Sequence, residues 1–272
     1  VQTCALPIYR KRVNLELFIA RRIAHNGSGN RPGVMVRIAV VAVALSVTVM
    51  ILALAVIMGF KREITDRVTG FSAQVEVADL RSAGSIESVP VLRSEQLERT
   101  IRSAGEVVRL TPYAVKGGVV KTPDAILGVM LKGVDGGYEW SFFRDHLLEG
   151  ELPRVGDSIR TKEILISRSV AREMGLAPGD KVEMLFVESE KSPRRDRFKV
   201  SGIYATGMDE FDRSVAMTDL RNVQRLADWS SEEVSGYEVT LADFLQAEDF
   251  SRRLNDMLLD SDREAFWDLT AR

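Results

Sequence analysis

The hydrophobic pattern of this chain separates one long apolar run from a longer region of short alternating segments. The run IAVVAVALSVTVMILALAVIMGF, residues 38–60, has no charged residue and lies between Arg37 and the pair Lys61-Arg62. As a helix it would extend for about 35 Å, compared with about 30 Å for the hydrocarbon core of a bilayer. A helix without a polar face has no side to turn toward water. The pattern therefore predicts a transmembrane helix over residues 34–60.

A buried core helix and a cleaved signal peptide are the alternatives for this run. A core helix seldom extends this far without a polar position. The triplet Ala53-Leu54-Ala55 has the small-x-small form of a cleavage site. However, it lies inside the run, and the 37 residues before the run are far longer than the charged start of a signal peptide. The transmembrane helix is therefore the interpretation that we adopt.

The segment before the run predicts a helix at the membrane surface. In NLELFIARRIAH, apolar residues recur at helical spacing beside two arginines, so we assign residues 11–33 to a cytoplasmic juxtamembrane amphipathic helix. Residues 18–37 carry four arginines and no acid, and residues 61–80 carry three basic residues, which favours a cytoplasmic N-terminus. VQTCALPIYR lacks an initiator Met and joins no later pattern, so residues 1–10 are interpreted as a non-native leader.

Short strands and short helices alternate after the run, and this predicts an α+β domain over residues 61–272. Residues 61–68 are expected to continue the helix as a stalk, and Val75 and Val77 alternate with polar residues as in a half-buried strand. Ser94 is an expected N-cap of a helix that ends at Gly105. Further segments follow from periodicity and turn residues: strands at 107–111, 114–121, 125–131, 182–187, 198–205, 215–217 and 237–241, and helices at 167–174, 219–227 and 244–258.

Composition and charge exclude several classes of function. The net charge is −2 and the pI is about 5.9, so no basic field indicates binding to nucleic acid. Cys4 is the only cysteine, so residues 5–272 form no disulfide, which argues against a disulfide-stapled secreted scaffold. No GxxxxGK[ST] phosphate loop and no GxSxG serine motif occurs.

Few polar clusters are candidates for chemistry. His25 and His146 have no other ligand at metal spacing, and the acidic turn Asp209, Glu210 and Asp212 is more typical of a solvated turn than of a cation site. The aromatic residues of GGYEWSFFRDH are candidates for a binding surface, but such a group more often anchors a loop on its own core. The sequence therefore predicts no catalytic residue, no metal and no cofactor in this chain.

Several stretches resemble a known family of transporters. FIARRI, residues 18–23, and IMGFKREITDRVTGFSAQVEV, residues 57–77, are similar to the start of Lol-type lipoprotein-releasing ABC permeases. LKGVD (131–135), EILISRSVAREMGLAPGDKVEMLFV (163–187) and RFKVSGIYATGMDEFDRSVAM (197–217) resemble the periplasmic core domain that this family shares with MacB-like transporters. The resemblance implies a MacB-like periplasmic domain of two subdomains, and it covers most of residues 15–241.

The resemblance implies a transport role without catalysis. The family has four spans per subunit, so this chain would hold the first span and the periplasmic domain and would end before the other three. The implied function is a permease subunit that releases lipoproteins from the bacterial inner membrane toward a periplasmic carrier. The implied partners are a separate ABC ATPase subunit that binds ATP, a second permease subunit, the lipoprotein substrate, the lipoprotein carrier and membrane lipid.

Two groups of residues are candidate sites by the same resemblance. In Lol-type systems the first span helps to line a cavity for acyl chains, which implies a role for Met50, Leu54, Ile57 and Met58; the alternative is that each of these merely faces lipid or neighbouring helices. The loop expected at ESEKSPRRDR, residues 188–197, corresponds to a hairpin that captures the carrier in one family member. The implied carrier-binding residues are Lys191, Ser192, Pro193, Arg194 and Arg195, although the segment lacks the apolar tip of that pattern.

Three other functions remain as alternatives. A MacB-like efflux or mechanotransmission permease would have the same fold and is not separated from the Lol type by the motifs. A single-span sensor would need a cytoplasmic output domain, and about 23 native residues before the span are too few for one. A membrane-anchored hydrolase would need a nucleophile and a base, and no such pair is evident.

Overall fold

The structure is a computed structural model that describes residues 32–71, 73–82, 87–123, 125–156, 158–188, 191–260 and 269–271, together with Leu15, Glu16, Phe18, Ile19 and Arg22. The chain divides into two units, Val1–Thr65 and Asp66–Arg272. The expected leader, residues 1–10, lies outside the described residues. So does most of the expected juxtamembrane helix, although the five single residues named above are helical.

The long apolar helix predicted from the sequence is confirmed as part of α2 (Pro32–Phe71). Pro32 occupies the first position of the helix, where its missing N–H is not needed. Within the described part of the chain, Gly33–Phe60 is the one stretch of helix long and apolar enough to cross a bilayer, and all of its residues are exposed. The helix continues through the expected stalk to Phe71.

One part of the domain is a four-stranded antiparallel sheet with two helices. Its elements are β1 (Val75–Asp79), α3 (Glu95–Ser103), β3 (Val107–Lys121), β11 (Gly236–Leu241), α8 (Ala247–Asp260) and β12 (Leu269–Ala271). The strands lie in the order β12-β1-β11-β3, and every neighbouring pair is antiparallel. This order, with one helix after the first strand and one after the third, is the β-α-β-β-α-β arrangement of ferredoxin-like domains.

The other part of the domain is a six-stranded barrel inserted between β3 and β11. It shares β3 and adds β4 (Ile126–Val134), β6 (Glu163–Ser167), β7 (Lys181–Glu188), β8 (Lys191–Tyr204) and β9 (Val215–Asp219). Pairing runs from β3 through β4, β9, β6, β8 and β7 and returns to β3, so this sheet closes on itself. The two expected subdomains thus correspond to a ferredoxin-like part and a barrel, joined through one continuous strand.

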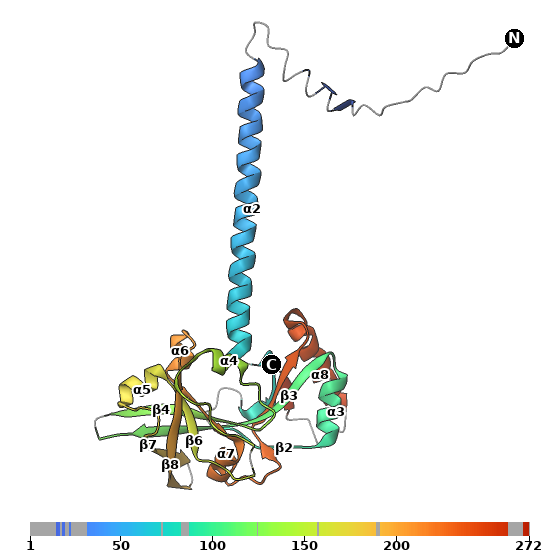
Figure 1. Ribbon diagram of the computed structural model, residues 1–272. Coiled ribbons are helices and arrows are strands. Elements are labelled where there is room, and N and C mark those ends of the chain that lie inside the picture. The colour runs from blue at the N-terminus through green and yellow to red at the C-terminus, as the bar shows by residue number, and fades with distance from the viewer. Residues whose placement is uncertain are drawn as a thin grey trace, which may run out of the picture. The chain divides into compact units, whose positions relative to one another are not determined.

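Shorter elements connect and cover the two parts. They are η1 (Leu80–Ser82), β2 (Val91–Leu92), α4 (Ser141–Asp145), β5 (Leu147–Gly150), α5 (Arg168–Met174), α6 (Asp209–Asp212), α7 (Leu220–Ala227), β10 (Glu233–Val234) and η2 (Phe244–Gln246). Strand β5 extends the sheet beyond β8, and β2 pairs with β10 in a small separate sheet. Figure 1 shows β4 and β7 extended together on the barrel side, with α3 and α8 grouped on the ferredoxin-like side. The mixture confirms the predicted α+β class.

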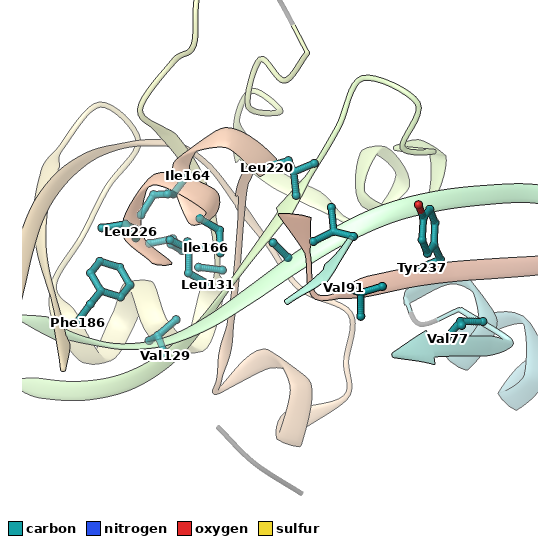
Figure 2. Packing of buried hydrophobic residues seen from close by; sticks show 14 of the residues in the cluster. Val77, Val91, Val129, Leu131, Ile164, Ile166, Phe186, Leu220, Leu226 and Tyr237 are labelled. Carbon is teal, nitrogen blue, oxygen red and sulfur yellow. The ribbon is translucent and has the colours of Figure 1, made fainter. Parts of the chain in front are cut away.

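A single large hydrophobic cluster runs through both parts, and a smaller one lies on the outside of the barrel. Figure 2 shows members of the large cluster along the strands and on α7: Val77, Val91, Val129, Leu131, Ile164, Ile166, Phe186, Leu220, Leu226 and Tyr237. In the ferredoxin-like part, Leu97 and Ile101 of α3 and Phe250 of α8 belong to the same cluster as Val77 and Tyr237. The helices therefore seal one face of the sheet.

The expected N-cap Ser94 is confirmed, and the helix expected at 167–174 is present as α5 with its N-cap at Ser167. The Ser94 hydroxyl accepts a hydrogen bond from the Leu97 N–H at 3.1 Å and caps α3. Ser167 caps α5 in the same way, and Gly175 ends that helix with a left-handed φ of 63°. These residues act through contacts within four positions, which is why a single sequence reveals them.

Two strand predictions were wrong in their bounds. The strands expected at 107–111 and 114–121 are one continuous strand, β3. Pro112 does not interrupt it, because β4 pairs with β3 only from Tyr113 onward, so no hydrogen bond from a residue 112 N–H is needed on that side. The loop expected over 188–197 is mostly strand as well, since β8 begins at Lys191 and pairs with β7 up to Glu188. Arg195 and Arg197 there lie 3.6 Å from Glu183 of β7, so opposite charges across the strands support the pairing.

Candidate functional site

The four residues expected to meet acyl chains lie on one face of α2. Met50, Leu54, Ile57 and Met58 are spaced by four, three and one positions, which at 3.6 residues per turn places them within about 100° around the helix. All four side chains are exposed. Leu52 and Val56, which are exposed to a similar degree, fall on the opposite face. The helix therefore offers an apolar surface on every side, and these four residues form one strip of it.

The β7–β8 hairpin carries the residues expected to bind a carrier. Pro193 is exposed on the strand, and Arg195 is exposed with its guanidinium 3.6 Å from Glu183. Arg194 is directed to the end of α7, where it pairs with Asp228 and donates to the Arg225 carbonyl at 3.2 Å. The side chains of Lys191 and Ser192 lie outside the described residues. Two of the three expected basic side chains are thus engaged with the domain itself.

A cluster of cations surrounds Asp196 on the same strand, and the sequence reasoning missed it. The Asp196 carboxylate is only 7% exposed, lies 2.5 Å from the Lys162 ammonium and pairs with Arg225. The pKa of Lys162 is lowered by burial and by the positive charges of Arg225 and Arg160. The pKa of Arg225 is lowered by burial and by the positive charges of Arg160 and Arg194. Residues from three distant segments meet here, so no spacing in the sequence reveals the cluster.

The acidic turn serves the structure of its own loop. The Asp212 carboxylate accepts hydrogen bonds from the Thr206 hydroxyl at 2.9 Å and from the backbone N–H groups of Thr206 and Gly207 at 3.2 Å. Its oxygens are thereby occupied in fixing the turn before α6. The side chains of Asp209 and Glu210 lie outside the described residues. Among the described residues, no group of three His, Cys, Asp or Glu side chains is arranged to hold a metal ion.

The aromatic segment 138–146 anchors a loop on the outside of the barrel. Phe143 is fully buried, with its ring 5.1 Å from the ring of Tyr204, and Trp140 packs at 5.7 Å from Phe143. Tyr138 packs edge-on to Trp140 at 5.0 Å, and burial raises the pKa of Tyr138 to about 12, against the opposing effect of Lys132. The smaller hydrophobic cluster consists of these residues together with Val134, Leu165 and Met217. The aromatic side chains therefore anchor their loop on the domain's own core, which is the second of the two interpretations given for this segment.

A charged network connects the two parts of the domain, and no pattern in the sequence indicates it. Lys132 of β4 pairs with Glu238 of β11, and the Tyr113 hydroxyl donates to Glu76 of β1. Burial alone would lower the pKa of Lys132, but the negative charge of Glu238 outweighs it and holds that pKa above its usual value. The Lys132 ammonium also lies 5.8 Å from the centres of the Tyr113 and Tyr138 rings. The network therefore connects strands β1, β3, β4 and β11 through their side chains.

Comparison with protein families gives one match over most of the chain. A family model described as MacB-like periplasmic core domain matches residues 38–257. A lipoprotein-releasing system transmembrane protein LolC from Xylella fastidiosa (strain 9a5c) is 27% identical over 224 residues, covering 77% of this chain and 50% of that protein. LolC from Neisseria meningitidis serogroup B (strain ATCC BAA-335 / MC58) is 26% identical over 225 residues, with 79% and 50% covered. The chain spans about half the length of these curated relatives.

Two solved structures with a similar trace are a periplasmic and an extracellular domain. The periplasmic region of MacB from Actinobacillus actinomycetemcomitans has a TM-score of 0.49 at 14% identity, covering 77% of this chain and 93% of that one. The extracellular domain of the noncanonic ABC-type transporter YknZ from Gram-positive bacteria has a TM-score of 0.47 at 14% identity, covering 73% and 98%.

Proposed function

The chain belongs to the MacB-like periplasmic core domain family, and from this premise we propose that it is part of an ABC permease that releases lipoproteins from the inner membrane. It is a membrane-anchored extracytoplasmic domain. In the proposal, the N-terminus is cytoplasmic, residues 61–272 are periplasmic, and a periplasmic carrier accepts the lipoprotein. A separate ATPase subunit binds and hydrolyses ATP, and a second permease subunit completes the transporter.

The observation that carries the proposal is the similarity to LolC over more than three quarters of the chain. At 27% identity this supports the family more strongly than the cargo, so the structural features of α2 matter as a second support. Acyl chains need contact with apolar groups and no hydrogen-bond partner, and the strip of Met50, Leu54, Ile57 and Met58 offers only such groups. We assign this strip to the wall that receives the lipoprotein acyl chains.

The domain is suited to transmitting movement from the membrane. β3 passes without a break from the ferredoxin-like part into the barrel, and the Lys132–Glu238 pair spans the same junction. A closed barrel and a braced sheet move as bodies more easily than they deform. We assign to the domain the role of following the spans when the ATPase subunit closes, and of presenting the β7–β8 hairpin to the carrier.

A MacB-like efflux or mechanotransmission permease is the second candidate. The matching family is described as MacB-like, and the match over residues 38–257 is compatible with this candidate as well as with the first. In that case the domain would move in the same way, but α2 would have no acyl chain to receive. The two candidates therefore differ in what contacts the strip on α2.

Photo-crosslinking from α2 in cells that contain the partner subunits tests the proposal. A benzoylphenylalanine at Leu54 or Met58 is expected to form a covalent product with palmitate-labelled lipoprotein. Leu52 and Val56 are the matched controls, because they are similarly exposed at similar depths on the opposite face. Product at the strip and little at the controls supports lipoprotein release. Equal labelling of both faces, or none at either, would overturn the assignment and leave the efflux candidate.

A further inference from the structure

Three cationic side chains meet at one carboxylate beside α7. The Lys162 ammonium lies 2.5 Å from Asp196, and Arg225 of α7 pairs with the same carboxylate. Besides burial, the positive charge of Arg160 lowers the pKa of both Lys162 and Arg225, so Arg160 lies close to the two of them. We call Arg160, Lys162 and Arg225 the cation triad.

The positive charge of the cation triad is not balanced by the domain. Three cations face the single negative charge of Asp196, which leaves a surplus of two positive charges. Two other carboxylates on these segments have cations of their own, since Asp228 pairs with Arg194 and Glu163 pairs with Arg154. Like charges at this spacing repel one another, and a bound anion would relieve the repulsion.

The backbone fixes the cation triad in place. The Lys162 carbonyl accepts a hydrogen bond from the Lys199 N–H of β8 at 2.8 Å. The Asn222 side-chain amide of α7 donates to the Thr161 carbonyl at 2.8 Å. The segment 160–162 is therefore held between β8 and α7, and the three cations are oriented before any ligand arrives.

The charged groups of the cation triad are open to solvent, whereas the carboxylate beneath them is not. The side chains of Lys162 and Arg225 are 44% and 47% exposed, and Arg160 is partly exposed. Asp196 is only 7% exposed. A solute that approaches this surface therefore meets the cations and not the carboxylate.

A phosphate group has the charge and the acceptors that this arrangement lacks. A phosphate monoester carries about −1.5 to −2 charges at pH 7 and three acceptor oxygens, which matches the surplus of two positive charges. Guanidinium groups bind phosphate oxygens in pairs, and an ammonium group adds a point charge. From the geometry and this balance of charge, we propose that the cation triad binds a phosphate group.

A phosphate bound here would contact three segments at once. Arg160 and Lys162 precede β6, Arg225 belongs to α7, and both Lys162 and Arg225 contact Asp196 of β8. The ligand would therefore fasten α7 to the strand that continues into the β7–β8 hairpin. This inference rests on the folded domain alone and not on the transported cargo.

The phosphate group can belong to a soluble ester or to a phospholipid, and two arms of one experiment distinguish these sources. Amide hydrogen exchange of the full chain is measured in dodecyl maltoside with and without glycerol phosphate at constant ionic strength. It is then measured in nanodiscs of phosphatidylcholine with and without phosphatidic acid, with no ester added. Isothermal titration calorimetry in the detergent gives the affinity for glycerol phosphate.

Arg160→Gln is the test variant, because Arg160 makes no ion pair with any residue in the described part of the chain and its loss should leave the fold intact. Circular dichroism checks that the variant is folded. Arg168→Gln is the matched control, since Arg168 is exposed on α5 and removes the same charge elsewhere.

The expected result is slower exchange at residues 160–162 and 194–196 when the phosphate is present. Slower exchange with glycerol phosphate assigns the site to a soluble ester, and slower exchange only with phosphatidic acid assigns it to lipid. Arg160→Gln should weaken the binding about tenfold and abolish most of the protection, while Arg168→Gln should match the unaltered chain. Unchanged exchange in both arms would overturn the proposal, and so would binding that Arg160→Gln and Arg168→Gln weaken equally or not at all.

Discussion

Lys132 of β4 pairs with Glu238 of β11 across the strand β3 that lies between them. Glu238 stands directly opposite Glu76 of β1, so two like charges are neighbours on the sheet. Like charges in this position are destabilising unless a cation lies near them. Lys132 supplies that cation, while the Tyr113 hydroxyl holds Glu76. The pair therefore connects the barrel to the ferredoxin-like part and offsets one of the two negative charges on this face of the sheet.

Replacing Lys132 by Met is expected to lower the free energy of unfolding by about 3 kcal/mol, because it leaves Glu238 largely buried without a counter-charge. Urea unfolding of the full chain in detergent, followed by circular dichroism, measures the change. A Lys132→Met/Glu238→Leu variant should recover part of the loss, and Lys121→Met, at an exposed position, should change stability by less than about 0.5 kcal/mol. A double variant no more stable than Lys132→Met would argue against this account.

Adding a side chain at Gly118 on β3 is expected to destabilise the barrel. A Cβ there would lie 2.6 Å from the ring of Phe186, which is buried in the barrel. Gly118→Ala should therefore cost about 1–3 kcal/mol through overpacking. Thermal unfolding measures the loss, and a Gly118→Ala/Phe186→Leu variant should regain part of it by making room. Gly128→Ala on β4 is the control, because a Cβ added there would meet no atom of a non-adjacent residue within 4 Å. Equal losses at both glycines would contradict the packing argument.

Asp219 is expected to make stability fall in acid. Burial would raise its pKa, but hydrogen bonds from the Arg221 side chain and backbone and from the Gly156 N–H outweigh burial and hold the pKa below 3.8. Because the folded-state pKa lies below the unfolded one, this stabilisation is fully present above pH 3.8 and is lost as the pH falls through the lower value. Asp219→Asn should cost about 2 kcal/mol at pH 7, and the difference should shrink below about pH 3.8. Urea unfolding between about pH 7 and 3 measures this dependence.

The exposed Asp256 on α8 provides the comparison for that experiment. Asp256→Asn should change the free energy of unfolding by less than about 0.5 kcal/mol, since its side chain is exposed. A loss in Asp219→Asn that stays constant down to about pH 3 would show that shape, and not charge, accounts for the role of Asp219.

The parts of the fold that the sequence predicts are those set by neighbours along the chain. The apolar run of α2 and the cap Ser94 depend on residues within one or two turns, and both were found as expected. The closed barrel was not predicted, because closure depends on β7 pairing with β3 about 65 positions away. Periodicity shows that a segment is a strand but does not say which strand lies beside it.

The same limit applies to the candidate site. The strip on α2 follows from helical spacing, and the structure places its four residues on one face as that spacing requires. The cations around Asp196 come from the segment before β6, from β8 and from α7, and only the fold brings Lys162 and Arg225 to the same carboxylate. The hairpin was predicted as a loop because its charged residues resemble loop composition, whereas the pairing of Arg195 and Arg197 with Glu183 makes them compatible with a strand.

The position of the β7–β8 hairpin is expected to depend on its attachment to α7. If the hairpin meets the lipoprotein carrier, as proposed, a photo-crosslinker at the exposed Pro193 should form a covalent product with it in cells. The same crosslinker at Arg168, exposed on α5, serves as the control. Product at Pro193 and none at Arg168 would support capture by the hairpin.

Arg194 distinguishes positioning of the hairpin from direct contact with the carrier. Arg194 pairs with Asp228 at the end of α7, and such an exposed pair stabilises one geometry by less than about 1 kcal/mol. Asp228→Asn should therefore reduce the Pro193 product by about threefold while the charge of Arg194 is kept. Arg194→Ala should reduce it to the same extent if Arg194 only positions the strand, and much further if its guanidinium contacts the carrier. Absence of the product in the unaltered chain, while the α2 positions still label with lipoprotein, would remove the hairpin from the mechanism and leave the permease assignment intact.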